Sequence, residues 1–194
     1  MTMKHTHEAG RSMIEMLGVL AIIGVLSVGG IAGYSQAMSK YKVSKTTDQV
    51  QTMVTNIRTL FAGQRTYAGL TAENAYTMGI LTDETWDKVN SLASNAYGGS
   101  ILLNTANSDH YFVITYNGLS RDACTRISMS DWGDSSSGLV GLNVTGAEQD
   151  DASAKAGTTN FETADGDLPL KLTAAVNACE GDTDNNAAIS WVYR

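Results

Sequence analysis

The sequence contains few of the residues that interrupt helices or build catalytic centres. Its 194 residues include one proline, Pro169, and three histidines. A single proline leaves room for long, uninterrupted helices and strands. His5 and His7 lie near the amino end and His110 is isolated in the sequence, so no Ser-His-Asp or Cys-His arrangement can be argued. We therefore expect no enzymatic activity and no cofactor.

Positive charge is also scarce. Acidic residues outnumber lysine and arginine by 20 to 13, which gives a formal net charge of -7. Surfaces that bind nucleic acids are normally basic, so this balance argues against a nucleic acid partner. The apolar content of 43% is high enough for a packed core, and the chain as a whole is not compositionally disordered.

One long stretch lacks charge altogether. As a helix, residues 16–34 would span about 28 Å, close to the hydrocarbon thickness of a bilayer. We interpret them as a transmembrane segment. A cleaved secretory signal is the alternative, because small residues follow the most apolar part, but the helical pattern continues past them. Glu15, at the start of the stretch, needs a partner because burying an unpaired charge is costly.

The helical pattern extends well beyond the apolar stretch. No proline interrupts residues 12–62, so the sequence predicts one helix of about 50 residues. Arg58 and Gly63 are typical of its carboxyl end. The second half of this helix is amphipathic. Its apolar stripe consists of Val50, Met53, Val54, Ile57, Leu60 and Phe61.

The rest of the chain predicts an α+β fold, in which the long amino-terminal helix packs on a mainly antiparallel sheet. We expect strands at 100–104, 110–117, 138–144 and 187–194, helices at 72–78, 83–92, 119–127 and 167–179, and a polar loop at 145–167. Ser120 is the predicted N-cap of the third helix. Asp167 is the candidate cap of the last helix, with Pro169 in its first turn.

Two cysteines, Cys124 and Cys179, lie in the polar carboxyl half. If the apolar segment carries this half across a membrane, the compartment is oxidising and a disulfide follows. Two reduced cysteines in a cytosolic protein are the alternative.

A short acidic stretch near the carboxyl end is the weak candidate for a metal site. Asp182, Asp184 and Asn186 alternate like half of a calcium loop. Ala187 stands where that loop needs glycine, and no bidentate glutamate follows. A polar surface turn is the preferred interpretation, so we expect no metal.

Two segments resemble a known family. GRSMIEMLGVLAIIGVL, which starts at Gly10, resembles the class III signal of type IV prepilins: a glycine, four residues, a glutamate and an apolar helix. YFVITYNGLSRDAC and the later AAVNACEGDTDNNAAISWVYR are similar to the disulfide-bounded region of type IVb major pilins. Ala32 stands where many type IVa helices carry a proline. The resemblance implies the pilin fold with a leader (1–10), a membrane or filament-core half of the helix (11–34), an amphipathic half (35–63), and a head (64–194) containing the disulfide-bounded region 124–179.

The resemblance also implies a processing and assembly route. In the family, a prepilin peptidase cuts after the glycine, here Gly10, and methylates the new amine, here on Arg11, where the family usually has an apolar residue. The glutamate, here Glu15, pairs with the amine of a neighbouring subunit, and an ion pair with Arg11 of the same helix is the alternative. We expect a precursor in the bacterial inner membrane, assembly machinery as a partner, and a homo-oligomeric extracellular filament used for attachment or aggregation.

Two other functions are compatible with the same sequence features. A type II secretion pseudopilin or a minor pilin would make no long fibre. A single-span, membrane-anchored periplasmic binding module would keep its amino terminus intact.

Overall fold

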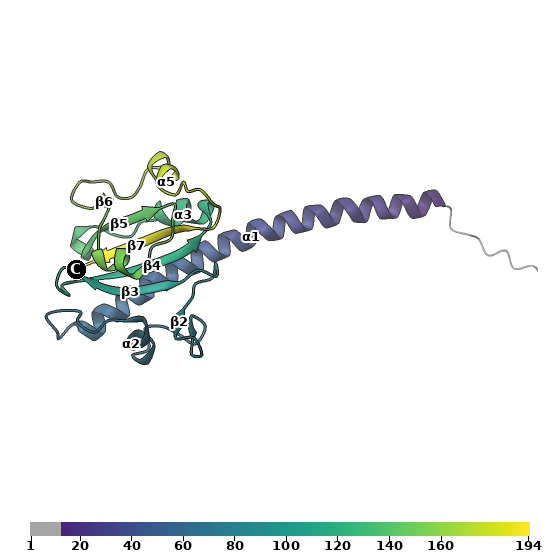
Figure 1. The fold of residues 1–194 in the computed structure, drawn as a ribbon. Coiled ribbons are helices and arrows are strands. Elements are labelled where there is room, and N and C mark those ends of the chain that lie inside the picture. Colours follow the sequence, from purple (N-terminus) through teal and green to yellow (C-terminus); the bar gives the residue numbers. More distant parts are fainter. Residues whose placement is uncertain (1–12) are drawn as a thin grey trace, which may run out of the picture. The chain divides into compact units, whose positions relative to one another are not determined.

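The computed structural model describes residues 13–194, which divide into two compact units at the boundary between Lys40 and Tyr41. Helix α1 (Met13–Phe61) runs through this boundary without interruption, and Figure 1 shows it as one continuous coil. The prediction of a single long helix is therefore confirmed, since no proline breaks its hydrogen-bond ladder.

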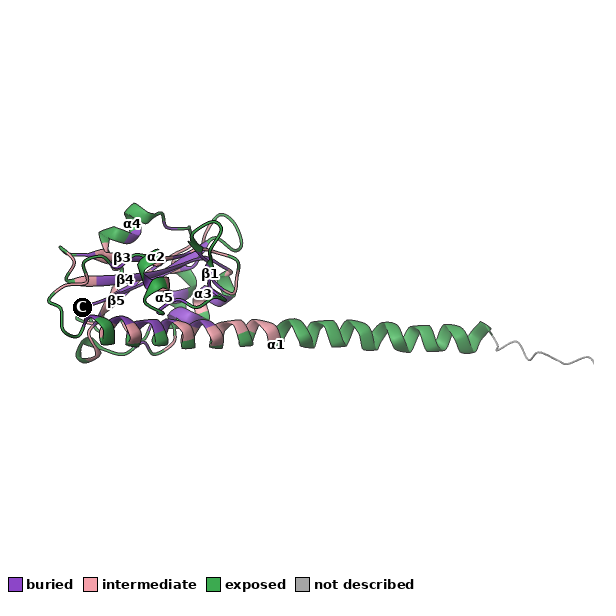
Figure 2. Cartoon of the chain, turned by 90° about the horizontal axis from the view of Figure 1, so that it is seen from below, coloured by how far each residue is buried: buried purple, intermediate pink, exposed green. Residues whose placement is uncertain are grey.

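The first unit consists of the amino-terminal part of α1. All its side chains from residue 13 to residue 37 are exposed, which Figure 2 shows as a continuous green ribbon. This part is long and apolar enough to cross a membrane. No other described residues cover its apolar side chains.

The second unit, Tyr41–Arg194, is built on an antiparallel five-stranded sheet with the order β3-β4-β7-β5-β6. Its strands are β3 (Ile101–Ala106), β4 (Tyr111–Leu119), β5 (Leu139–Thr145), β6 (Phe161–Glu162) and β7 (Ala187–Tyr193). The C-terminal strand β7 lies in the middle, paired with β4 on one side and β5 on the other. The predicted α+β class and the four predicted strands are confirmed.

The second half of α1 packs on one face of this sheet through a stripe centred on Ile57. The buried residues of the stripe are Thr46, Val50, Met53, Val54, Ile57 and Phe61. Leu60 was expected among them but is 45% exposed. At about 100° per residue, the buried residues extend from Met53, about 40° to one side of Ile57, to Val54, about 60° to the other side. Leu60 lies about 60° from Ile57 on the side of Met53, just outside this range, whereas Thr46 lies about 20° from Ile57. Angular position therefore decides burial here more than side-chain polarity does.

Short helices complete the unit. They are α2 (Ala72–Thr77), α3 (Arg121–Ser128), the 3-10 turn η1 (Ser135–Ser137), α4 (Asp151–Ala156) and α5 (Leu172–Ala178). Residues of α3 and α5 belong to the same core as α1, while Gly157, at the end of α4, lies against Ala106 on the opposite face. Every residue of β7 is buried because both faces of the sheet are covered.

Helix α3 starts as predicted, since the Ser120 hydroxyl accepts a hydrogen bond from the backbone N–H of Ala123. Helix α5 does not. Its N-cap is Lys171 in an extended conformation, so Asp167 is no cap and Pro169 lies before the helix. A residue that precedes proline is driven away from helical backbone angles, which keeps Leu168 out of the helix.

The segment 83–92 is not the expected helix. It contains a small hairpin of β1 (Trp86–Asp87) and β2 (Leu92–Ala93). The Asp87 carboxylate accepts hydrogen bonds from the backbone N–H groups of Val89 and Asn90, and this turn competes with a helix for the same backbone groups.

The segment 145–167 is more ordered than the predicted loop, because it contains α4 and β6. Asp150 caps α4 by accepting from the backbone N–H of Ser153, and Gly157 ends it in the left-handed conformation. Both residues are ordinary helix boundary signals that the overall polarity of the segment concealed.

Candidate functional site

Glu15 lies in the first turn of α1 and is exposed. It forms no ion pair with any residue from 13 to 194. An acidic residue in the first turn also complements the helix dipole. Gly10 and Arg11 lie outside the described residues, so cleavage after Gly10 and pairing of Glu15 stay predictions.

The apolar segment that follows Glu15 presents large side chains in every direction. Those more than half exposed are Met16, Leu17, Val19, Leu20, Ile22, Ile23, Val25, Leu26, Val28, Ile31 and Tyr34. Met13 and Ile14, just before Glu15, are also more than half exposed. A continuous apolar surface of this size on a soluble protein marks a membrane or protein interaction site. The segment is therefore the principal candidate functional site of the chain.

Cys124 and Cys179 form a disulfide, which confirms the predicted pairing. Cys124 is in α3 and Cys179 is the C-cap of α5; both are buried, and their Cα atoms are 5.9 Å apart. The bridge joins two short helices that are 55 positions apart in the sequence. Closing a loop of this length lowers the conformational entropy of the unfolded state. By the chain-entropy treatment of disulfides, this stabilises the folded state by about 4 kcal/mol.

Sequence reasoning missed a close backbone contact between a segment inside the disulfide-bounded region and the segment just after Cys179. A Cβ atom placed on Gly146 would lie 2.0 Å from the Glu180 carbonyl oxygen, and one on Gly181 would lie 1.9 Å from the Gly146 carbonyl oxygen. The segment after β5 therefore touches the segment after α5 with no room for a side chain. Glycines at these two positions were visible in the sequence, but nothing in it linked them.

Sequence reasoning also missed a buried polar network on the sheet. The Asn117 side chain donates to the Gln149 carbonyl at 2.9 Å and accepts from the Gln149 backbone N–H at 3.0 Å. Ser190 donates to the Gln149 side chain at 3.1 Å and bonds to Thr115 at 2.7 Å. These bonds fasten the loop before α4 to the two central strands, and they let polar groups lie inside the fold.

The weak metal candidates lie on the surface. Asp182, Asp184 and Asn186 are all exposed in a turn in which Asn185 has a φ of 69°. Among residues 13–194, no cluster of three or more His, Cys, Asp or Glu side chains could hold a metal ion.

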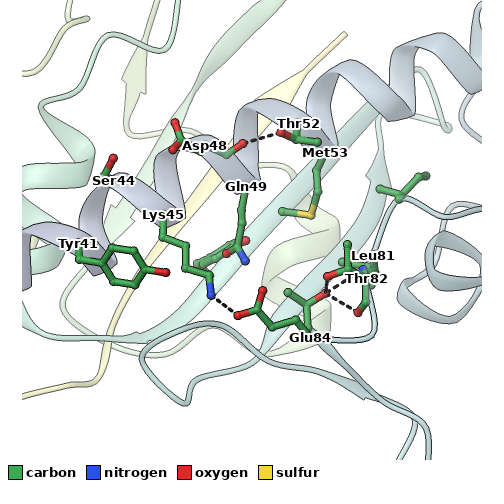
Figure 3. Close-up of a pocket in the computed structure, with 13 residues that line it drawn as sticks. Tyr41, Ser44, Lys45, Asp48, Gln49, Thr52, Met53, Leu81, Thr82 and Glu84 are labelled. Carbon is green, nitrogen blue, oxygen red and sulfur yellow. Dashed lines mark hydrogen bonds and ion pairs between the residues drawn. The ribbon is translucent and has the colours of Figure 1, made fainter. Parts of the chain in front are cut away.

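A cavity of about 520 Å³ opens between α1 and the segment before β1. Figure 3 shows Tyr41, Lys45 and Gln49 turned toward Glu84, whereas Ser44 and Asp48 point away from it. Lys45 forms an ion pair with Glu84, which bridges the two sides of the cavity and raises the pKa of Lys45. Tyr116 lines the cavity from β4; its burial raises the pKa of its hydroxyl.

Comparison with known proteins places the chain in a family. A family model described as Bundlin matches residues 35–194. The chain belongs to the bundlin family. Two curated relatives are each named major structural subunit of bundle-forming pilus. The one from Escherichia coli O127:H6 (strain E2348/69 / EPEC) is 27% identical over 146 residues, covering 74% of this chain and 75% of the relative. The one from Escherichia coli O111:H- is 26% identical over 199 residues, covering 99% and 97%.

Solved structures show the same fold at lower sequence identity. A type IV b pilin from Salmonella typhi matches with a TM-score of 0.53 and 18% identity, over 78% of this chain and 99% of that one. TcpA, a type IV pilin from Vibrio cholerae El Tor biotype, matches with a TM-score of 0.52 and 16% identity, over 79% and 99%. The predicted pilin fold is confirmed, and the chain is a structural pilin and not an enzyme.

Proposed function

We propose that this chain is the major structural subunit of a type IVb pilus, an extracellular filament used for attachment or aggregation. Its membership of the bundlin family and its relatives, both named as major subunits of a bundle-forming pilus, support this function. The observation that carries the proposal is the apolar part of α1, which has no covering partner among the described residues and is attached to a folded, disulfide-linked head.

The apolar segment has two environments that can bury it. In the precursor, the bacterial inner membrane surrounds residues 13–34 with hydrocarbon at little cost. Outside the membrane, the same surface must be covered by protein, and identical segments of neighbouring copies supply that cover. Head-to-tail association of identical copies generates an open helical filament when the repeated rotation does not close into a ring. The heads then face the extracellular solvent, where oxidising conditions preserve the disulfide.

Five glycines in the apolar segment support close packing with other copies. A Cβ atom placed on any of them meets nothing within 4 Å, so no contact that the structure describes requires a glycine there: Gly18, Gly24, Gly29, Gly30 and Gly33. Each weakens an isolated helix by up to about 1 kcal/mol relative to alanine. Small residues in apolar helices allow neighbouring helices to approach closely, which offsets that cost.

Processing converts the precursor into the assembling subunit. We propose that prepilin peptidase removes residues 1–10 by cutting after Gly10 and methylates the new amine of Arg11. Residues 11–34 then form the filament core, 35–63 the amphipathic half of the helix and 64–194 the head. The new amine carries a positive charge that can pair with the Glu15 carboxylate of a neighbouring copy. This pairing lets both charged groups lie inside the filament after the helix leaves the lipid. Pilus assembly machinery drives this transfer.

Substituting Glu15→Ala tests the proposal. Because the carboxylate acts only between copies, the variant chain should enter the membrane and form its disulfide normally. The amount of chain recovered in filaments sheared from cells should fall by at least about tenfold. Glu73→Ala, which removes an exposed glutamate from α2, is the matched control and should assemble normally. Normal filament yield from Glu15→Ala would show that the pairing does not drive assembly, and absence of the unmodified chain from all sheared filaments would contradict the function itself.

A further inference from the structure

The second half of α1 has an outer face that the core does not use. Figure 2 shows this face exposed along the helix, on the side away from the sheet. It carries short polar residues and one charge, at Asp48: Ser44, Asp48, Thr52, Thr55 and Thr59. All five are exposed. The face continues, on the same helix, from the apolar segment to which the proposed function assigns the filament core.

The threonines of this face have already satisfied their hydroxyl groups. Thr52 donates to the Asp48 carbonyl oxygen at 2.8 Å, Thr55 to that of Gln51 at 2.9 Å, and Thr59 to that of Thr55 at 2.8 Å. Contact with another protein can therefore remove water from these side chains without stranding a hydroxyl donor. The carboxylate of Asp48 is the charged group on this face, and burying it would require a partner of opposite charge.

Asp48 forms no ion pair in the part of the chain that the structure describes. Its carboxylate points away from the Lys45–Glu84 ion pair, and neither a salt bridge nor a hydrogen bond to it is found among residues 13–194. Lys45 is engaged with Glu84, and the Lys42 ammonium lies over the Tyr97 ring at 5.3 Å.

Lys40 has the complementary charge. It is exposed, and within residues 13–194 it forms neither an ion pair nor a cation–π contact. It precedes Asp48 by eight residues of α1, about 12 Å along the axis, which is too far for an ion pair within one copy. Two copies that run side by side in the same direction, offset by about 6–12 Å, bring one copy's Lys40 close to its neighbour's Asp48.

We propose that the outer face of α1 from Ser44 to Thr59 is a contact surface for a second copy of this chain, whose Lys40 pairs with Asp48. This inference rests on the proposed filament and adds a specific contact to it. The apolar segments supply adhesion without fixing how far neighbouring copies are offset, because an apolar surface has little directional preference. A charge pair at one position of each helix selects the offset, as charged positions select register in paired helices.

Charge reversal with rescue tests this contact in cells that make the full chain. Lys40→Glu and Asp48→Lys each place like charges opposite one another, so each should lower the filament yield at least about tenfold relative to the membrane-inserted chain. The double variant Lys40→Glu, Asp48→Lys restores opposite charges and should recover the yield to within about twofold of the unmodified chain. If Lys40→Glu lowered the yield by disturbing membrane insertion, the double variant would have the same defect, because it keeps glutamate at position 40. Rescue by the double variant therefore reports the contact between copies and not membrane insertion. Glu73→Lys and Lys171→Glu make the same charge changes at exposed positions of the head and should leave the yield within about twofold.

The outcomes separate this inference from the proposed function. Rescue in the double variant supports the contact. Single reversals that assemble like the controls, or a double variant as poor as the worse single variant, overturn the contact while filaments of the unmodified chain still form. If the unmodified chain is absent from every filament, the proposed function fails and the contact fails with it.

Discussion

Gly146 and Gly181 lie where two backbone segments of the head touch, and the nearest atoms are main-chain atoms that cannot move aside as a side-chain end could. Gly146→Ala should therefore lower the free energy of unfolding by about 1–3 kcal/mol. The matched control is Gly63→Ala, because a Cβ there meets nothing within 4 Å, and it should stay within about 0.5 kcal/mol of the unmodified chain. Urea unfolding followed by tryptophan fluorescence measures both. Equal midpoints for the two variants would contradict the contact.

Also at the scale of single residues, hydrogen bonds to carboxylates predict how the head responds to acid. The pKa is lowered below the ordinary aspartate value at Asp83, Asp87, Asp134 and Asp150. The hydrogen bonds to Ser153 are the main cause at Asp150, the N-cap of α4. A carboxyl group whose pKa is lower in the folded state stabilises that state above its unfolded pKa, and this stabilisation is lost as pH falls through the folded pKa.

The melting temperature should consequently change little from pH 7 to about pH 5 and fall steadily below about pH 4. Asp150→Asn keeps an oxygen acceptor for the cap but cannot titrate, so its melting temperature should depend less steeply on pH in the acid range. An unchanged slope in the variant would mean that this cap contributes nothing to acid sensitivity.

At the scale of elements, the packing of α1 on the sheet depends on angular position around the helix. Ile57 is fully buried, whereas Leu60, three residues later and similar in size, is 45% exposed. Ile57→Ala should lower the free energy of unfolding of the full chain in detergent by about 2–5 kcal/mol. Leu60→Ala should lower it by less than about 1 kcal/mol, because most of the removed surface already contacts solvent. Similar losses in both variants would place the centre of the packed stripe elsewhere.

The elements that could be predicted are those whose pattern is long or whose boundary residues act locally. The uninterrupted helix α1, the apolar strands β4 and β7, and the Ser120 cap of α3 all follow from residues close together in the sequence. The hairpin of β1 and β2 could not be predicted so easily, because each strand is two residues long and its turn depends on the Asp87 side chain. In α4, a cap and a terminal glycine were present, but the polar composition between them favoured a loop interpretation.

For the candidate site, the sequence was sufficient to predict a covalent link and a feature formed by one continuous segment. The pairing of Cys124 with Cys179 and the apolar segment after Glu15 are features of this kind. The contact between Gly146 and Gly181 and the buried bonds of Asn117 join positions far apart in the chain, so they depend on the completed fold. The proposed pairing of Asp48 with Lys40 of a neighbouring copy depends on how copies assemble, so it could not be predicted from the sequence of one chain.

At the scale of the whole molecule, the proposal is that one chain exists in two states, a membrane precursor and a trimmed subunit whose apolar helix lies inside a filament. Mass spectrometry of the amino-terminal peptide, from chains recovered in sheared and purified filaments, measures this most directly. We expect a chain that begins at Arg11, with its amine methylated. Filaments that lack this chain, or a purified chain that still begins at Met1, would contradict it.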